Sequence, residues 1–200
     1  MGRPRAGTHA VPTPERILDA AEAAFGDHTY ADARLADIAR VAGVRRPSLL
    51  YHFESKELLH TAVVERLFAD IIGRFERSMV ADATPAEIID QLFVIWVGFI
   101  ADRPAFAPLV VRGIIDGQGP VREQLRDQLV PLLNVVEQWI HHAGVLPSGM
   151  SARAALLQIG SDTLLRASSG PLEEALWGTT PAIETVRRLF DLPARPAESD

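Results

Sequence analysis

The chain has 200 residues and a formal net charge of −6, with 20 Lys and Arg against 26 Asp and Glu. It contains no cysteine, which excludes disulfides, thiolate catalysis and zinc sites with Cys ligands. Because it also lacks a charge-free apolar run of about 18 residues and a signal-peptide pattern, we expect a cytoplasmic protein without a membrane partner.

The negative charge is confined to one part of the chain. Residues 1–60 carry eight Arg or Lys and eight Asp or Glu, whereas residues 61–200 carry twelve against eighteen. Attraction of a phosphate backbone depends on where the charges point and not on the total. The net charge therefore does not exclude nucleic-acid binding by the N-terminal part.

Capping signals and apolar periodicity predict four helices in the N-terminal part. Residues 1–12 are rich in Gly, Pro and Arg and are predicted to form a flexible arm. Thr13 and Pro14 begin a helix that runs to about Gly26. Two short helices at 35–42 and 46–52 and a longer one from about Ser55 to Val80 follow.

The remaining pattern also predicts helices and no strands. Pro131 is expected to kink one of them. A segment punctuated by Gly and Pro, 169–181, separates the last two helices, and the tail 193–200 is predicted to be disordered. The predicted helices are 85–102, 105–116, 120–143, 151–168 and 181–191, which gives an all-α fold of about nine helices.

The run Gly43–Leu59 is the most informative part of the sequence. Gly43 follows a helical pattern at the position where the left-handed conformation ends a helix, and Pro47 suits the first turn of the next helix. Leu49 and Phe53 are expected to face inward. Arg46, Ser48, Leu50, Tyr51 and His52 then face outward, as cations, a hydroxyl and apolar surface that suit the major groove of DNA.

From about Pro14 to Leu67 the chain resembles the N-terminal domain of the TetR family of transcriptional regulators. In that family a three-helix domain with a helix-turn-helix precedes a longer helical domain that binds a small molecule. Arg45 departs from the pattern, since Ser is usual there, and so does Leu50, where an aromatic residue is common. The matching residues are Ile17, Ala20, Ala21, Phe25, Tyr30, Leu35, Asp37 to Ala39, Ala42 to Val44, Arg46, Leu49, Tyr51 to Phe53, Ser55 to Glu57 and Leu58.

The resemblance implies a ligand-responsive transcriptional regulator, for which we expect repression. A homodimer would bind palindromic double-stranded DNA and would be released by a small, largely apolar effector. The expected division is a DNA-binding domain at 13–54 and a ligand-binding and dimerisation domain at 55–192. The predicted DNA-binding residues are Arg34, Arg45, Arg46, Ser48, Leu50, Tyr51, His52 and Lys56.

The same resemblance implies a ligand cavity among the middle helices and a dimer contact through the last two large helices. Trp96, Phe99 and Trp139 are predicted as apolar wall, and Asn134 as a polar group that needs a partner if it is buried. Burial in a core also accounts for each aromatic residue, so both interpretations stay open. The predicted dimer contacts are Leu156, Ile159, Leu164, Val186 and Leu189.

Enzyme functions are not indicated. The chain has no Gly-x-Ser-x-Gly elbow, no Gly-rich phosphate loop ending in Lys and no His-Glu-x-x-His motif. One Glu-x-x-His pair, Glu57 with His60, falls short of a di-iron site. His141 and His142 near Glu137 are more typical of helix-end histidines than of a metal site, so no cofactor or metal is predicted. A helical binding or stress protein without DNA affinity remains the alternative.

Overall fold

The computed structural model describes residues 11–78, 83–115, 120–144, 146, 149 and 151–189, and these residues form helices and turns without a strand. The predicted all-α class is confirmed. In chain order the helices are α1 (Thr13–Asp27), α2 (Leu35–Val41), α3 (Arg46–His52), α4 (Lys56–Ser78), α5 (Pro85–Asp102), α6 (Phe106–Ile115), α7 (Pro120–Ala143), α8 (Ala152–Ser168), the 3-10 helix η1 (Gly170–Leu172), α9 (Glu173–Trp177) and α10 (Ala182–Leu189).

The helices predicted from the sequence are all present, and α7 continues through Pro131. The pattern does not predict η1 and α9, which lie in the segment 169–181. They are bounded by Gly170 and Gly178, both at positive φ, and five residues are too few for an apolar period to be recognised. The predicted arm, apart from its last two residues, and the predicted tail lie outside the described residues.

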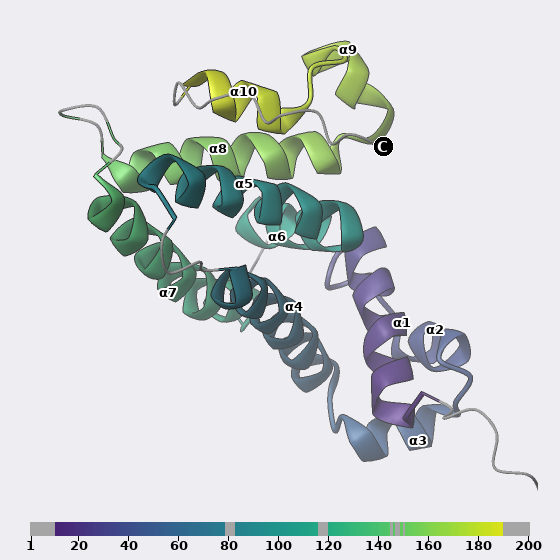
Figure 1. Ribbon diagram of the computed structural model, residues 1–200. Coiled ribbons are helices and arrows are strands. Elements are labelled where there is room, and N and C mark those ends of the chain that lie inside the picture. The colour runs from purple at the N-terminus through teal and green to yellow at the C-terminus, as the bar shows by residue number, and fades with distance from the viewer. Residues whose placement is uncertain are drawn as a thin grey trace, which may run out of the picture.

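The helices gather around the two ends of α4. Figure 1 shows α1, α2 and α3 at one end of α4, the helices α5 to α8 packed at the other, and α9 and α10 lying over α8. The buried face of α4 runs through both groups as one stripe: Leu59, His60, Val63, Val64, Leu67, Phe68, Ile71 and Phe75. Among the described residues, the buried apolar side chains form one core cluster that extends from Ile17 to Val186.

Helix α1 meets α6 at a very close approach. A Cβ atom built on Gly26 would lie 2.5 Å from the Cβ atom of Ala105 and 2.7 Å from its Cα atom. Arg112 of α6 donates to the backbone oxygen of Asp27 at 3.3 Å, next to this contact. The start of α6 therefore rests directly on the end of α1.

No single helix among the described residues combines the length and apolar composition needed to cross a membrane. Helices α5 and α6 meet that criterion only as a pair, and they are bent by 94° at the break between them.

We predict that Gly26→Ala destabilises the protein by about 1 to 3 kcal/mol, because the added methyl group forces α1 and α6 apart. Gly98→Ala is the matched control, since Gly98 is an exposed position in α5 with open space around its Cβ site. This second change should raise the free energy of unfolding by up to about 1 kcal/mol. Urea denaturation measures both, and equal effects of the two changes would contradict the close approach.

Candidate nucleic-acid interface and apolar cavity

The turn between α2 and α3 is set by backbone hydrogen bonds around Gly43. Gly43 has a φ of 67°, its amide donates to the carbonyl of Arg40 at 3.2 Å, and the amide of Val44 donates to the carbonyl of Ala39 at 2.9 Å. This arrangement ends α2 with a left-handed residue, where glycine avoids the clash of a Cβ atom. It also fixes the direction in which α3 leaves α2.

One face of α3 is buried and the other is open. Leu49 is completely buried, whereas the side chain of Tyr51 is 83% exposed. Arg45, Arg46 and His52 are exposed as well, and the rings of Tyr51 and His52 lie edge to face with centroids 5.3 Å apart. The helix thus presents a polar and aromatic flank to solvent.

Other residues of the predicted DNA-binding set are less open. Ser48 and Leu50 are half-buried, and Leu50 packs against the core. Arg34 is exposed and precedes α2 without capping it. Phe53, predicted to face inward, is also half-buried.

Lys56 is engaged within the chain. Its Nζ atom donates to the backbone oxygen of Ala31 at 3.0 Å and lies 4.7 Å from the centroid of the Tyr30 ring. Burial lowers the pKa of the Lys56 ammonium, against the opposing effect of the charge on Asp32. Lys56 therefore fastens the loop between α1 and α2 onto α4, which leaves it less available for a phosphate than its sequence position suggests.

A cavity of about 120 Å³ lies among α4, α5, α6, α7 and α8. Trp96 of α5 lines it, as predicted, and its indole N–H donates to the hydroxyl of Thr163 at 2.6 Å. The lining carries no formally charged side chain and consists of Phe75, Ile89, Leu92, Phe93, Trp96, Ile114, Leu129, Leu132, Leu133, Val136, Ile140, Leu156, Leu157, Gly160, Ser161 and Leu164.

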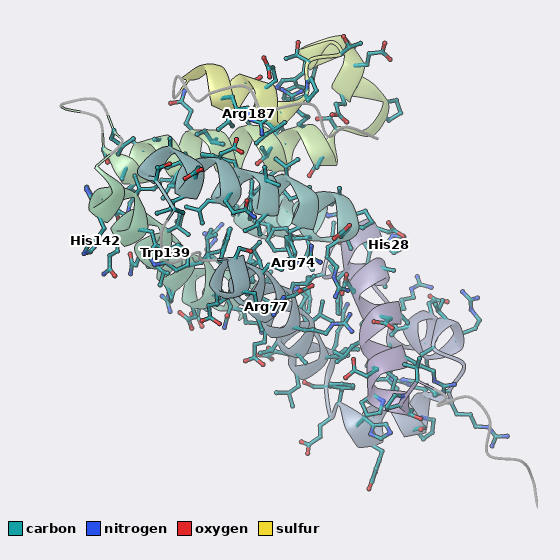
Figure 2. The ribbon with its side chains drawn as sticks, viewed as in Figure 1. His28, Arg74, Arg77, Trp139, His142 and Arg187 are labelled. Carbon is teal, nitrogen blue, oxygen red and sulfur yellow. The ribbon has the colours of Figure 1, made fainter. Side chains whose placement is uncertain are left out.

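Two residues predicted as cavity wall and the one predicted as its polar group do not line it. Phe99 is buried against Phe106, with ring centroids 4.9 Å apart. Trp139, labelled on α7 in Figure 2, packs against the ring of Phe75 instead. Asn134 is exposed and accepts a hydrogen bond from Arg153. The cavity face of α7 is formed by Leu129, Leu132, Leu133, Val136 and Ile140, and Asn134 lies on the opposite side of the helix.

The residues predicted for a dimer contact mostly face inward. Leu156 and Leu164 line the cavity, while Ile159 and Val186 are buried within the chain. The side chain of Leu189 lies outside the described residues. These four described residues therefore expose little side-chain surface in the single chain.

Polar side chains join the α1 end of the molecule to the rest. Glu22 of α1 accepts hydrogen bonds from Arg66 of α4 at 2.5 Å and from Arg103, just after α5, at 3.5 Å. Arg103 also donates to Asp70 of α4 at 3.1 Å, and two hydrogen-bonding arginines hold the pKa of the Asp70 carboxyl below its usual range despite partial desolvation. Asp70 also accepts from Arg74, which Figure 2 labels on α4.

His60 occupies the junction between α1, α4 and α7. It is buried, its Nδ1 atom lies 2.6 Å from Oε1 of Gln124 on α7, and the rings of Phe25 and Tyr30 meet it edge to face. Burial lowers the pKa of the His60 imidazole, with Gln124 acting in the opposite direction and the charge of Lys56 lowering it further.

No group of three or more His, Asp or Glu side chains in the described part of the chain is arranged to hold a metal ion. Glu137, the acidic neighbour of His141 and His142, accepts a hydrogen bond from Arg153 at 2.6 Å. Its Oε1 atom lies 3.9 Å from Nε2 of His141.

Comparisons with known proteins agree with this geometry. Residues 17–63, which contain α2, α3 and most of α1, match the model of the tetR family of bacterial regulatory proteins. The HTH-type transcriptional regulator RutR of Escherichia coli K12 is 26% identical over 192 residues, which cover 90% of this chain and 89% of that protein.

Solved structures of regulators share the fold over most of the chain. The fatty acid degradation regulator FadR from Bacillus halodurans superposes with a TM-score of 0.75 at 17% identity, over 92% of this chain and 96% of that one. FadR from Bacillus subtilis, solved in complex with stearoyl-CoA, gives a TM-score of 0.71 at 17% identity, over 89% and 96% of the two chains. The arrangement of the helices is therefore that of TetR-like regulators.

We predict that acid destabilises the protein partly through His60. Because the folded state lowers the pKa of this imidazole, the unfolded chain takes up a proton first as the pH falls below about 6.5. The stabilising contribution is complete above that pH and is lost as the pH falls towards the folded pKa.

In His60→Leu, the free energy of unfolding should therefore fall less between pH 7 and 5 than in the wild type, as measured by urea denaturation at each pH. His28→Leu is the control, because His28 lies exposed just after the end of α1 (Figure 2), and this change separates the effect of the buried His60 from that of any His-to-Leu substitution. A wild-type slope retained in His60→Leu would refute the assignment.

Proposed function

We propose that this chain, which belongs to the TetR family of transcriptional regulators, is a repressor that binds palindromic operator DNA as a homodimer and is released by a small apolar effector. The observation that carries the proposal is the outer flank of α3, where Arg45, Arg46, Tyr51 and His52 are exposed opposite the buried Leu49. We assign DNA recognition to residues 13–54 and effector binding with dimerisation to residues 55–192.

The length of α3 argues for two copies. Its seven residues span on the order of 10 Å, so one helix reads only a few base pairs. Two copies related by a twofold axis place their recognition helices roughly 34 to 36 Å apart, one turn of DNA, and double the number of bases that are read. The operator then has the same symmetry as the protein.

The exposed cations near α3 can attract DNA despite the overall charge. Arg34, Arg45 and Arg46 are exposed and form no ion pair with any described residue. Arginine binds guanine edges and phosphates in a bidentate manner. The acidic excess belongs to residues 61–200, which extend away from α3 along α4 (Figure 1). The local field at the recognition flank is therefore the relevant one.

The cavity supports an uncharged effector. Its lining offers the Ser161 hydroxyl and aromatic or aliphatic side chains but no Lys, Arg, Asp or Glu. A charged group buried there would lose its hydration without gaining a partner. Apolar cavities of on the order of 150 Å³ bind molecules of the size of benzene. Bacillus subtilis FadR holds a stearoyl-CoA in the same fold; here we propose that only apolar parts of a ligand enter.

Two contacts connect the cavity to the DNA-binding part. Ile114 of α6 lines the cavity, and the other end of α6 rests on Gly26 of α1. Leu125 and Leu129 continue α7 from the cavity towards Gln124, which contacts His60. A ligand that moves α6 or α7 would shift α1 and α4 and so change the distance between the two recognition helices. The ligand can shift the equilibrium between the two conformations only by the difference between its binding free energies for them. That difference is about 1.4 kcal/mol for each tenfold difference in affinity.

The first test is selection of binding sites from random duplex DNA. The wild type should enrich a sequence with twofold symmetry and lose affinity steeply with salt. Tyr51→Ala should weaken binding to that sequence by about tenfold or more in gel-shift titrations, since an exposed side chain at the centre of the flank is removed. Leu176→Ala, a truncation at another exposed apolar side chain far from α3, should have no effect. Failure to enrich any duplex would favour the alternative of a helical binding protein.

The second test concerns the effector site. Benzene, an uncharged probe of the size that such a cavity holds, should bind the wild type in calorimetric titrations and release the selected DNA, whereas benzenesulfonate should bind at least about tenfold more weakly. Gly160→Leu, which adds a side chain at the cavity wall where a Cβ atom meets open space, should weaken probe binding without preventing DNA binding. Equal affinity for the two probes would rule out a closed apolar site.

A further inference from the structure

The indole at the wall of the cavity already has a hydrogen-bond partner within the chain. The N–H of Trp96 donates to the hydroxyl of Thr163 at 2.6 Å. That hydroxyl in turn donates to the backbone oxygen of Ile159 at 3.0 Å, and Thr163 is buried. A ligand that took the N–H of Trp96 would leave the buried Thr163 with one hydrogen bond fewer, so this N–H is not available to a ligand without a cost.

Ser161 is the other described side chain of the cavity wall that has a hydrogen to donate, and its hydroxyl is used as well. It donates to the backbone oxygen of Leu157, one turn earlier in α8, at 2.6 Å. A serine hydroxyl has one hydrogen and two lone pairs. The bond to Leu157 therefore uses the donor of Ser161 and leaves its Oγ atom able to accept.

The backbone of the wall offers no further donor. Only the first four amide groups of a helix lack a partner within the helix, and every described residue of the wall lies further into its helix. Ile89 is the fifth residue of α5 and Leu156 the fifth of α8, and the others lie further still from a helix start. The described residues of the wall thus present the Oγ atom of Ser161 as an acceptor and no unused donor.

We infer that the effector carries one hydrogen-bond donor, an O–H or N–H group, which bonds to the Oγ atom of Ser161 while the apolar body of the effector fills the cavity. A donor on the ligand adds a hydrogen bond to those already present. An acceptor gains nothing, because the hydroxyl of Ser161 must first leave the oxygen of Leu157. The chemical class is therefore uncharged phenols, alcohols and N–H compounds, and not ketones or esters.

The place of Ser161 in the wall also sets the orientation of such a ligand. Ser161 is exposed, as are Leu157 and Ile114, which line the cavity with it, so these three residues mark its mouth. Ile89 and Ile140 of the wall are buried, and a polar group placed beside them would lose its hydration without gaining a partner. The donor group therefore stays at the mouth, and the apolar body points inward.

This inference rests on the proposed effector site and names the chemical class that fits it. Three small rings separate a donor from an acceptor. Benzene has neither, phenol adds an O–H group, and pyridine, which is uncharged at pH 8, replaces one C–H of benzene by an acceptor nitrogen. Each affinity is measured by calorimetric titration and divided by the affinity of the same protein for benzene, so that changes in packing cancel.

Ser161→Ala removes the acceptor. Its phenol-to-benzene affinity ratio should lie about three- to tenfold below that of the wild type, as expected for one hydrogen bond, whereas its pyridine-to-benzene ratio should match the wild type. Ser168→Ala is the matched control. Ser168 lies in the same helix and donates in the same way to the backbone oxygen of Leu164, at 2.7 Å, but it does not line the cavity. Both ratios should keep their wild-type values in this control.

Three outcomes would overturn the inference. They are a phenol ratio that Ser161→Ala leaves unchanged, a pyridine ratio that falls as far as the phenol ratio, and an equal fall of the phenol ratio in Ser168→Ala. The second outcome would show that the hydroxyl turns and donates to the ligand. None of the three touches the proposed function as long as benzene binds and releases the operator. Failure of all three rings to bind the wild type would instead reject the proposed effector site, and the inference with it.

Discussion

The whole structure depends on one buried stripe on α4. Leu59 at its start packs in the core with α1, and Phe75 near its end lines the cavity. Between them the helix rises on the order of 24 Å without an interruption of the buried face. Both halves of the molecule therefore pack against the same helix. The proposed domains are thus functional divisions of one continuous core.

Most helix ends could be predicted from the sequence because they are determined locally. Thr84 and Glu87 form a capping box at the start of α5, and Gly43 ends α2 in the left-handed conformation; both signals are contained in a few neighbouring residues. The assignment of apolar residues to particular partners could not be predicted. Helix α8 is apolar on two sides, so Leu156 and Leu164, predicted for a dimer contact, line the cavity instead. Phe99 packs against Phe106 and Trp139 against Phe75, and burial alone does not say which neighbour a side chain meets.

Several charged side chains distant from α3 form close ion pairs, whereas the exposed arginines near α3 do not, among the described residues. Arg66, Arg74 and Arg103 neutralise Glu22, Asp70 and Asp102 between α1, α4 and the end of α5, and Arg187 of α10, labelled in Figure 2, is paired with Asp90 of α5. Charges paired at close range contribute little field at a distance. The exposed arginines around α3 have no such partners among the described residues, so their charges are available to the proposed DNA ligand, whereas Lys56 is engaged with Ala31.

Pro131 removes one backbone hydrogen bond from the middle of α7. A proline inside a helix has no amide hydrogen, so the carbonyl of Asp127 loses its usual donor one turn earlier. This gap lies beside Leu129, Leu132 and Leu133, all of which form the wall of the cavity. A bend of α7 at this turn breaks no further backbone hydrogen bond. We therefore expect α7 to bend here when the cavity widens. In the proposed function, we therefore expect effectors of different size to be accommodated at this turn of α7.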